Sequence, residues 1–126
     1  PAAPAPILAS DRDAGAIDAT IANAKRAGVS ADLTISRRAL SEIELPAGPG
    51  WLVTNPPYGV RVGESSGLRD LYAQLGNIGR AKMRGWTMAM VSAEPALERA
   101  TRLGFEPVIK TRNGGIPVRI VVARVE

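Results

Sequence analysis

The sequence predicts an α/β fold in which a mostly parallel sheet carries a C-terminal antiparallel β-hairpin. Two observations favour this class. Short apolar runs alternate with segments of helical periodicity through most of the chain, as in parallel sheets with crossover helices. At the C-terminus, two strand-like segments, 105–111 and 116–125, flank Asn113-Gly114-Gly115, a turn sequence that tolerates positive φ. The fold therefore combines parallel strands with one antiparallel strand.

The N-terminal segment has the pattern of a strand, a helix and a second strand. Ile7–Asp11 is a short apolar run that ends in an acid. Ala14–Ala27 has apolar residues at helical spacing, with Asp13 suited to the N-cap and Gly28 to the C-cap. Residues 32–36 form the next short strand. This segment therefore supplies two strands joined by a helix.

The next elements repeat this alternation. Trp51–Thr54 is apolar until its last residue, which suits a central strand covered on both faces. The segment 67–84 predicts an amphipathic helix, and 86–91 predicts the next buried strand. Ser92 as N-cap, with an early proline at position 95, then opens a short helix that extends to about Leu103. The apolar stripe of the longer helix is expected at Leu68, Leu71, Leu75, Ile78 and Lys82.

Five large side chains are assigned to packing. Trp51 and Trp86 each open an apolar strand, so we expect them in the core or at the sheet edge rather than stacked on a ligand. Met83, Met88 and Met90 are expected to fill core gaps.

The composition excludes several kinds of chemistry. The chain has no Cys and no His, which excludes a disulfide, a thiolate nucleophile, an imidazole base and the usual zinc site. Catalysis must then use carboxylates, amides, hydroxyls and backbone groups. A formal charge of +4 favours approach to a polyanion but equally suits ordinary solubility. The apolar runs are far shorter than the roughly 20 residues of a membrane-spanning helix.

Candidate ligand-binding residues follow the predicted strands, because an open α/β sheet binds ligands at the carboxyl ends of its strands. Asp11-Arg12-Asp13 follows the first strand, Arg37-Arg38 the second and Asn55-Pro56-Pro57-Tyr58 the third. An acid in the place of Asp11 can accept two hydrogen bonds from a ribose diol. Helix capping is the alternative role, but Asp13 fits the cap better.

The segment Asn55-Pro56-Pro57-Tyr58 is the most specific motif. Two prolines stiffen the loop, so the Asn55 side-chain oxygen and the Pro56 carbonyl can point at one site. Two acceptors that hold the hydrogens of an exocyclic amino group favour a pyramidal nitrogen, and they stabilise the positive charge that grows there during methyl transfer. Tyr58 offers an aromatic face for an extruded base. A rigid turn with a surface aromatic is the alternative interpretation.

These motifs resemble those of RNA N2-guanine methyltransferases whose catalytic domain usually follows an RNA-binding THUMP domain. That family includes bacterial enzymes acting on large-subunit ribosomal RNA. The Asn-Pro-Pro-Tyr motif is shared with DNA adenine and release-factor glutamine methyltransferases, but the extension at 59–64 and the Leu-Tyr-x-x-Leu-Gly helix favour the RNA guanine branch. The resemblance extends over the segments 10–16, 23–28, 54–61, 71–76 and 110–118.

The resemblance implies a cytoplasmic enzyme that uses S-adenosyl-L-methionine to methylate N2 of guanine in RNA, with ribosomal RNA the expected substrate. It implies that residues 1–126 are part of a class I methyltransferase domain, a Rossmann-like sheet that here lacks the first strand and its Gly-rich loop. Arg37 or Arg38 stands where related enzymes often carry an acid for the adenine amino group. The implied cofactor contacts are Asp11, Arg12, Arg38 and Asn55. The implied catalytic residues are Asn55, Pro56 and Tyr58. The implied substrate contacts are Pro57, Tyr58, Arg61 and Arg112.

Two alternatives and one structural expectation remain. The alternatives are N6-adenine methylation of DNA or RNA, and a non-catalytic module that only binds RNA or a partner subunit. Further basic residues that could follow an RNA backbone are Arg69, Arg80, Lys82, Arg84, Lys110 and Arg119.

Because the family's first strand separates the strands at 7–11 and 51–54, we expect those two strands not to pair directly in one continuous sheet.

Overall fold

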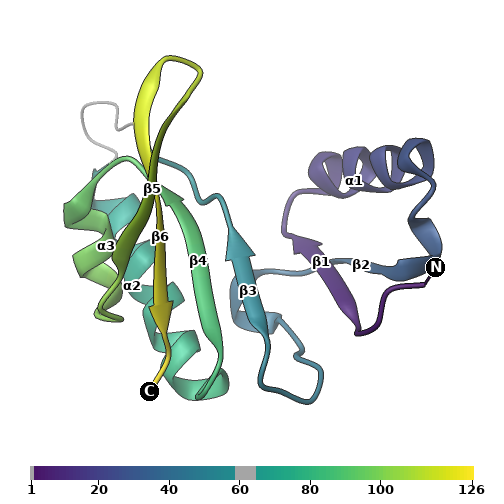
Figure 1. Ribbon diagram of the computed structural model, residues 1–126, viewed down its shortest axis with the longest axis horizontal. Helices are drawn as coiled ribbons and strands as arrows, with labels where there is room; N and C mark the ends of the chain where they lie inside the picture. The colour runs from purple at the N-terminus through teal and green to yellow at the C-terminus, as the bar shows by residue number, and fades with distance from the viewer. Residues whose placement is uncertain (1, 59–64) are drawn as a thin grey trace. The chain divides into compact units, whose positions relative to one another are not determined.

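In the computed structural model, the described residues 2–58 and 65–126 fold into two compact units, Pro1–Pro46 and Ala47–Glu126 (Figure 1). Within α2, side chains are described from residue 67 onward. The strands form a two-stranded sheet in the first unit and a four-stranded sheet in the second. None of the helices in the described ranges is long and apolar enough to cross a membrane.

The first unit has the predicted order of strand, helix and strand. β1 (Ile7–Asp11) pairs in parallel with β2 (Leu33–Arg37), and α1 (Ala14–Ala27) connects them. The predicted caps are confirmed: Asp13 Oδ2 accepts from the Ala16 N–H at 2.8 Å, and Gly28 has a φ of 73°. β2 lies one residue later than expected. Two 3₁₀ turns complete the unit, η1 (Ser30–Asp32) and η2 (Leu40–Glu42).

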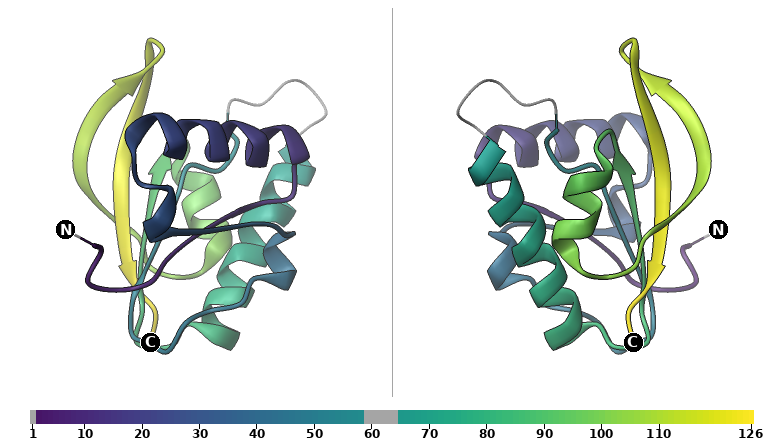
Figure 2. Two further views of the ribbon diagram at one scale, coloured as in Figure 1. Left: turned by 90° about the vertical axis from the view of Figure 1, so that its right-hand side faces the viewer. Right: turned by 90° about the vertical axis from the view of Figure 1, so that its left-hand side faces the viewer.

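The second unit is a four-stranded sheet with two helices on one face (Figure 2). The strand order is β3-β4-β6-β5, with β3 parallel to β4 and the other neighbours antiparallel, so the predicted mixed sheet is confirmed. Gly114 and Gly115 connect the hairpin with φ values of 57° and 82°. The elements are β3 (Trp51–Thr54), α2 (Ser65–Lys82), β4 (Thr87–Ser92), α3 (Pro95–Thr101), β5 (Glu106–Asn113) and β6 (Ile116–Arg124).

The core of the second unit lies between the sheet and α2. Met83, Met88 and Met90 are each at most 1% exposed, as expected of core residues. The buried stripe of α2 is rotated from the predicted one. It consists of Tyr72, Leu75, Gly76 and Gly79, and Met83 is buried just after the helix ends. Packing on α3 causes this rotation, because a Cβ at position 76 would overlap the Thr101 carbonyl. Leucine spacing alone predicted a different face.

The two tryptophans have different environments. Trp86 is buried and packs against Gly48 and Gly50, as predicted. Trp51 is 65% exposed on an edge strand, which agrees with the second of the two positions expected for it, the core or the sheet edge. Val53 is 76% exposed, so the expectation of a strand covered on both faces is wrong. β3 is an edge strand of its sheet, and within the second unit no described element covers the face that carries these two side chains.

Ser92 does not cap the following helix, which corrects a second prediction. Glu94 is the N-cap of α3, without a side-chain cap, and the helix starts at Pro95. Ser92 is the last residue of β4, and its hydroxyl donates to Glu98 at 2.7 Å. Glu98 is 7% exposed and forms an ion pair with Arg119. A buried carboxylate needs such partners, and this requirement determines the orientation of Ser92.

β1 and β3 are not paired with each other. β1 is hydrogen-bonded to β2 alone and β3 to β4 alone, so each has one side without a neighbouring strand in the described chain. The expectation that these two strands do not form one continuous sheet is confirmed.

Candidate active site

The Asn55-Pro56-Pro57-Tyr58 loop directly follows β3 and lies at the carboxyl end of the parallel pair β3–β4. Asn55 is exposed, whereas Tyr58 is half-buried. Proline at 56 and 57 removes two backbone donors and fixes two φ angles, so the loop needs external contacts to hold it on the sheet. The structure supplies two such contacts, one from α2 and one from the hairpin.

The contact from α2 is made by Tyr72. Its hydroxyl donates to the Pro57 carbonyl at 3.0 Å, and the side chain is 1% exposed. Burial, followed by the nearby Glu94, Tyr58 and Glu98, raises the pKa of Tyr72 from 10.0 to about 12. The phenol therefore stays protonated and remains a donor at any physiological pH.

The contact from the hairpin is made by Asn113. Its Nδ2 donates to the Tyr58 hydroxyl at 2.6 Å, across 55 positions of sequence. The last residue of β4, Ser92, pairs with Arg119 of β6. The part of β6 before Arg119 therefore extends past the carboxyl end of β4, the end of the sheet at which the loop lies (Figure 1). Arg112 Nη1 donates to the Gly115 carbonyl at 2.8 Å and braces the turn. The hairpin tip is thus a firm support for Tyr58.

In the first unit, one carboxylate oxygen of Asp11 accepts a hydrogen bond. The Asp13 N–H donates to Asp11 Oδ1 at 2.9 Å, while Asp13 itself caps α1. Within residues 2–58 and 65–126, Asp11 Oδ2 has no hydrogen-bond partner, and the side chain is exposed at the carboxyl end of β1. The predicted capping role of Asp13 is therefore confirmed, and the ligand-binding role of Asp11 stays a prediction.

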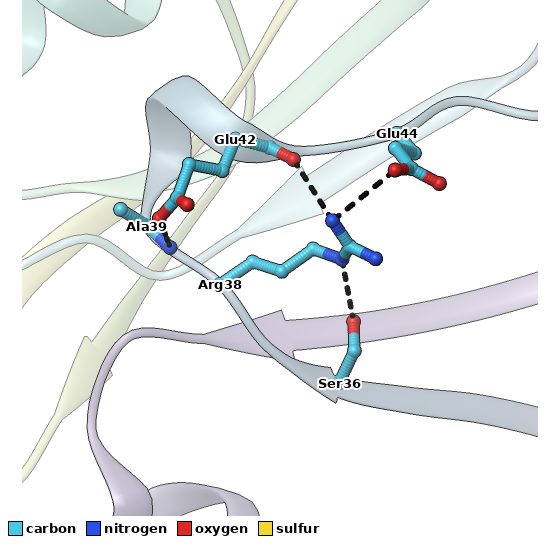
Figure 3. Close-up of polar contacts among 5 residues, drawn as sticks. All are labelled: Ser36, Arg38, Ala39, Glu42 and Glu44. Carbon is cyan, nitrogen blue, oxygen red and sulfur yellow. Dashed lines mark hydrogen bonds and ion pairs between the residues drawn. The ribbon is translucent and has the colours of Figure 1, made fainter.

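Arg38 is held by groups of its own unit (Figure 3). Its Nε donates to Ser36 Oγ at 3.3 Å, and its Nη1 lies 3.4 Å from the Glu42 carbonyl and 3.3 Å from Glu44 Oε1. The neighbouring Arg37 donates through Nε to the Arg12 carbonyl at 2.9 Å. The two arginines at the end of β2 thus order the loops that follow β1 and β2.

The predicted site residues fall into three groups. Asp11, Arg12 and Arg38 belong to the first unit, and the loop at 55–58 belongs to the second together with Arg112. Arg61 lies outside the described residues. Sequence reasoning missed the roles of Tyr72 and Asn113. The available signals were the position of Tyr72 on a helix face and that of Asn113 beside a glycine turn. Neither signal indicates a hydrogen-bond partner distant in sequence.

Several of the basic residues considered for RNA binding have internal partners. Arg119 pairs with Glu98, and Arg80 Nη1 donates to the Thr101 carbonyl at 2.7 Å at the end of α3. Both side chains thus have structural roles in the second unit. In the ranges that the structure covers, no cluster of three or more acidic residues could hold a metal ion.

With this geometry established, comparison with known proteins identifies the family. Residues 2–121 match the RMKL-like methyltransferase domain. The chain belongs to this family. The RMKL-like assignment agrees with the resemblance drawn from the Asn-Pro-Pro-Tyr segment and its neighbouring motifs.

Relatives of this RMKL-like domain include a putative RNA methyltransferase of Synechocystis, 33% identical over 93% of this chain and 30% of the relative. Ribosomal RNA large subunit methyltransferase K/L of Syntrophotalea carbinolica is 38% identical over 91% of this chain and 17% of its own length. The chain thus spans less than a third of these relatives. The solved structure of SMU.472, a putative methyltransferase complexed with SAH, has a TM-score of 0.85 at 21% identity, over 95% of this chain and 32% of that one. This likeness confirms the Rossmann-like fold.

Proposed function

We propose that residues 1–126 are part of a class I methyltransferase domain that methylates the exocyclic N2 amino group of guanine in RNA, with S-adenosyl-L-methionine as cofactor and ribosomal RNA as substrate. The observation that carries this proposal is the Asn55-Pro56-Pro57-Tyr58 loop at the carboxyl end of β3, held from two sides by Tyr72 and Asn113. The names of the two relatives, an RNA methyltransferase and a ribosomal RNA methyltransferase, support the choice of RNA.

The exposed Asn55 is the residue that acts on the amino group. Its side-chain oxygen and the Pro56 carbonyl accept hydrogen bonds from the two N–H groups of the target nitrogen. The nitrogen then becomes pyramidal, and its lone pair is no longer delocalised into the ring and can attack the methyl carbon. As positive charge develops on that nitrogen, both acceptors stabilise it. The Pro57 carbonyl is already bonded to Tyr72, so it serves to fix the loop rather than to bind the base.

The residues of the first unit fit the nucleoside part of the cofactor. Asp11 Oδ2 is exposed at a strand end, and its geometry suits the hydroxyls of a ribose. Arg12 and Arg38 are the other proposed contacts. Because the Arg38 guanidinium is bonded to Ser36, Glu42 and Glu44, we assign its cofactor contact to the backbone or to the outer edge of the guanidinium. When bound, the cofactor supplies an electrophilic methyl group.

The substrate residues are assigned as follows. Tyr58 stacks on the extruded base, which contributes about 1–3 kcal/mol, and Pro57 borders the same site. Arg61 and Arg112 contact the RNA backbone. We place the reaction in the cytoplasm, where ribosomal RNA is available in bacteria.

The test is methylation of defined RNA oligonucleotides by the complete protein, followed by nucleoside analysis. We expect N2-methylguanosine, and its loss in an Asn55→Ala variant. Label found only on N6 of adenosine would overturn the guanine assignment. Calorimetry with S-adenosylmethionine tests the remaining alternative: RNA binding without detectable cofactor binding would identify a non-catalytic module.

A further inference from the structure

We propose that Asn113 is a positioning residue that fixes the orientation of the Tyr58 ring, so that the hairpin tip determines how the target base is received. This inference rests on the proposed function for its consequence in catalysis. Its structural part stands on the contact between the hairpin and the loop.

The hydrogen bond from Asn113 restrains Tyr58 at its phenol oxygen. A hydrogen bond of 2.6 Å from Asn113 Nδ2 to the phenol oxygen fixes the position of that oxygen. The backbone on the other side is fixed too, because the Pro57 carbonyl accepts from Tyr72 and the proline ring limits its φ. A side chain held at its base and at its tip cannot turn its ring freely about its two side-chain torsions.

The support on the hairpin side is itself ordered. Asn113 is the last residue of β5 and pairs with Ile116 across the turn. The two glycines between them adopt positive φ, the conformation required by a two-residue turn, and Arg112 bonds the Gly115 carbonyl. Asn113 is exposed and lies outside the core, so replacing it does not remove buried apolar contacts.

The expected consequence is a loss of orientation rather than of folding. Without the bond, the Tyr58 ring samples several rotamers, and only some present a face for the base. Because one hydrogen bond between neutral groups is lost, we expect Asn113→Ala to lower kcat/KM for RNA by about 5- to 10-fold. Affinity for the cofactor should not change, because Asn113 bonds Tyr58, which is not among the proposed cofactor contacts.

A double-mutant cycle in the complete protein tests whether Asn113 acts through Tyr58. The variants are Asn113→Ala, Tyr58→Phe and the double variant, with kcat/KM for RNA as the readout. If Asn113 acts through the phenol, its substitution has no further effect in the Tyr58→Phe background. Independent, multiplicative losses would overturn the proposal. Asn113→Asp should restore most of the activity, since its carboxylate can accept from the Tyr58 hydroxyl.

A second readout does not depend on activity. With tyrosine rings labelled with ¹³C, Tyr58→Phe identifies the Tyr58 signals by their disappearance. Asn113→Ala should shift or broaden those signals in the RNA-free protein, whereas the control Asn23→Ala on the surface of α1 should leave them unchanged. Unchanged Tyr58 signals in Asn113→Ala would refute the positioning role. If Asn113→Ala clearly shifts the Tyr58 signals but the complete wild-type protein methylates no nucleic acid, the positioning role stands and the proposed function is rejected.

Discussion

The Tyr72 hydroxyl donates to the Pro57 carbonyl at 3.0 Å, which ties the candidate catalytic loop to the core of the second unit. Tyr72 lies on the buried stripe of α2, next to Leu75 and Gly76 along the same face. The position of the loop therefore depends on the packing of α2, so substitutions in the core can alter activity without touching the site.

Tyr72 makes the free energy of unfolding depend on pH in the alkaline range. Its pKa is about 12 in the folded chain and 10.0 in the unfolded chain, so its stabilising contribution is complete below pH 10 and is lost as the pH rises through 12. In that window the free energy of unfolding should fall by up to about 1.4 kcal/mol per pH unit from this group. Urea unfolding at several pH values between about 9 and 12 measures the slope. Tyr72→Phe should give a shallower slope, and equal slopes would contradict this assignment.

Gly76 permits the close contact between α2 and α3. A Cβ at position 76 would overlap the Thr101 carbonyl, and a backbone group can move away only if the helices separate. We expect Gly76→Ala to lower the free energy of unfolding by roughly 3 kcal/mol, at the upper end for overpacking. Gly67→Ala is the matched control in the same helix, since its Cβ meets nothing within 4 Å. That control should be neutral or stabilising by about 0.5–1 kcal/mol, and chemical denaturation distinguishes the two.

Asn55 should affect the rate much more than binding. Asn55→Ala removes one of the two acceptors for the amino group, and loss of a group that stabilises the transition state costs about 100- to 1000-fold in kcat. Single-turnover methylation measures the rate, while calorimetry should show nearly unchanged cofactor affinity. Asn23→Ala, at an exposed position of α1, is the control. Retention of most activity in Asn55→Ala would show that the amino group is held elsewhere.

Asp11 should give the opposite pattern. Asp11→Asn keeps the Oδ1 acceptor for the Asp13 N–H and so preserves the turn, but it removes the charge and one acceptor for a ribose hydroxyl. We expect weaker cofactor affinity, by about 10-fold if one hydrogen bond to a charged group is lost, with a smaller effect on the rate at saturation. Equilibrium dialysis measures the affinity. Asp18→Asn, exposed on α1, should bind the cofactor like wild type.

Local sequence determined most of the elements and the chemistry of the loop. Asp13 and Gly28 cap α1 as predicted, because capping depends on residues within one turn of each other. Gly114 and Gly115 form the hairpin turn for the same reason, since positive φ is a local requirement. The two prolines before Tyr58 likewise indicated a stiff loop after a strand.

The tertiary structure alone decided which distant groups meet. The rotated stripe of α2 follows from the absence of a side chain at Gly76, where the Thr101 backbone approaches. The bond between Asn113 and Tyr58 depends on the strand order and on how far the hairpin extends beyond β4. The exposure of Trp51 depends on β3 being an edge strand. A sequence pattern reports the preferences of neighbouring residues, whereas these contacts depend on how sheet and helices pack, and packing is a property of the whole unit.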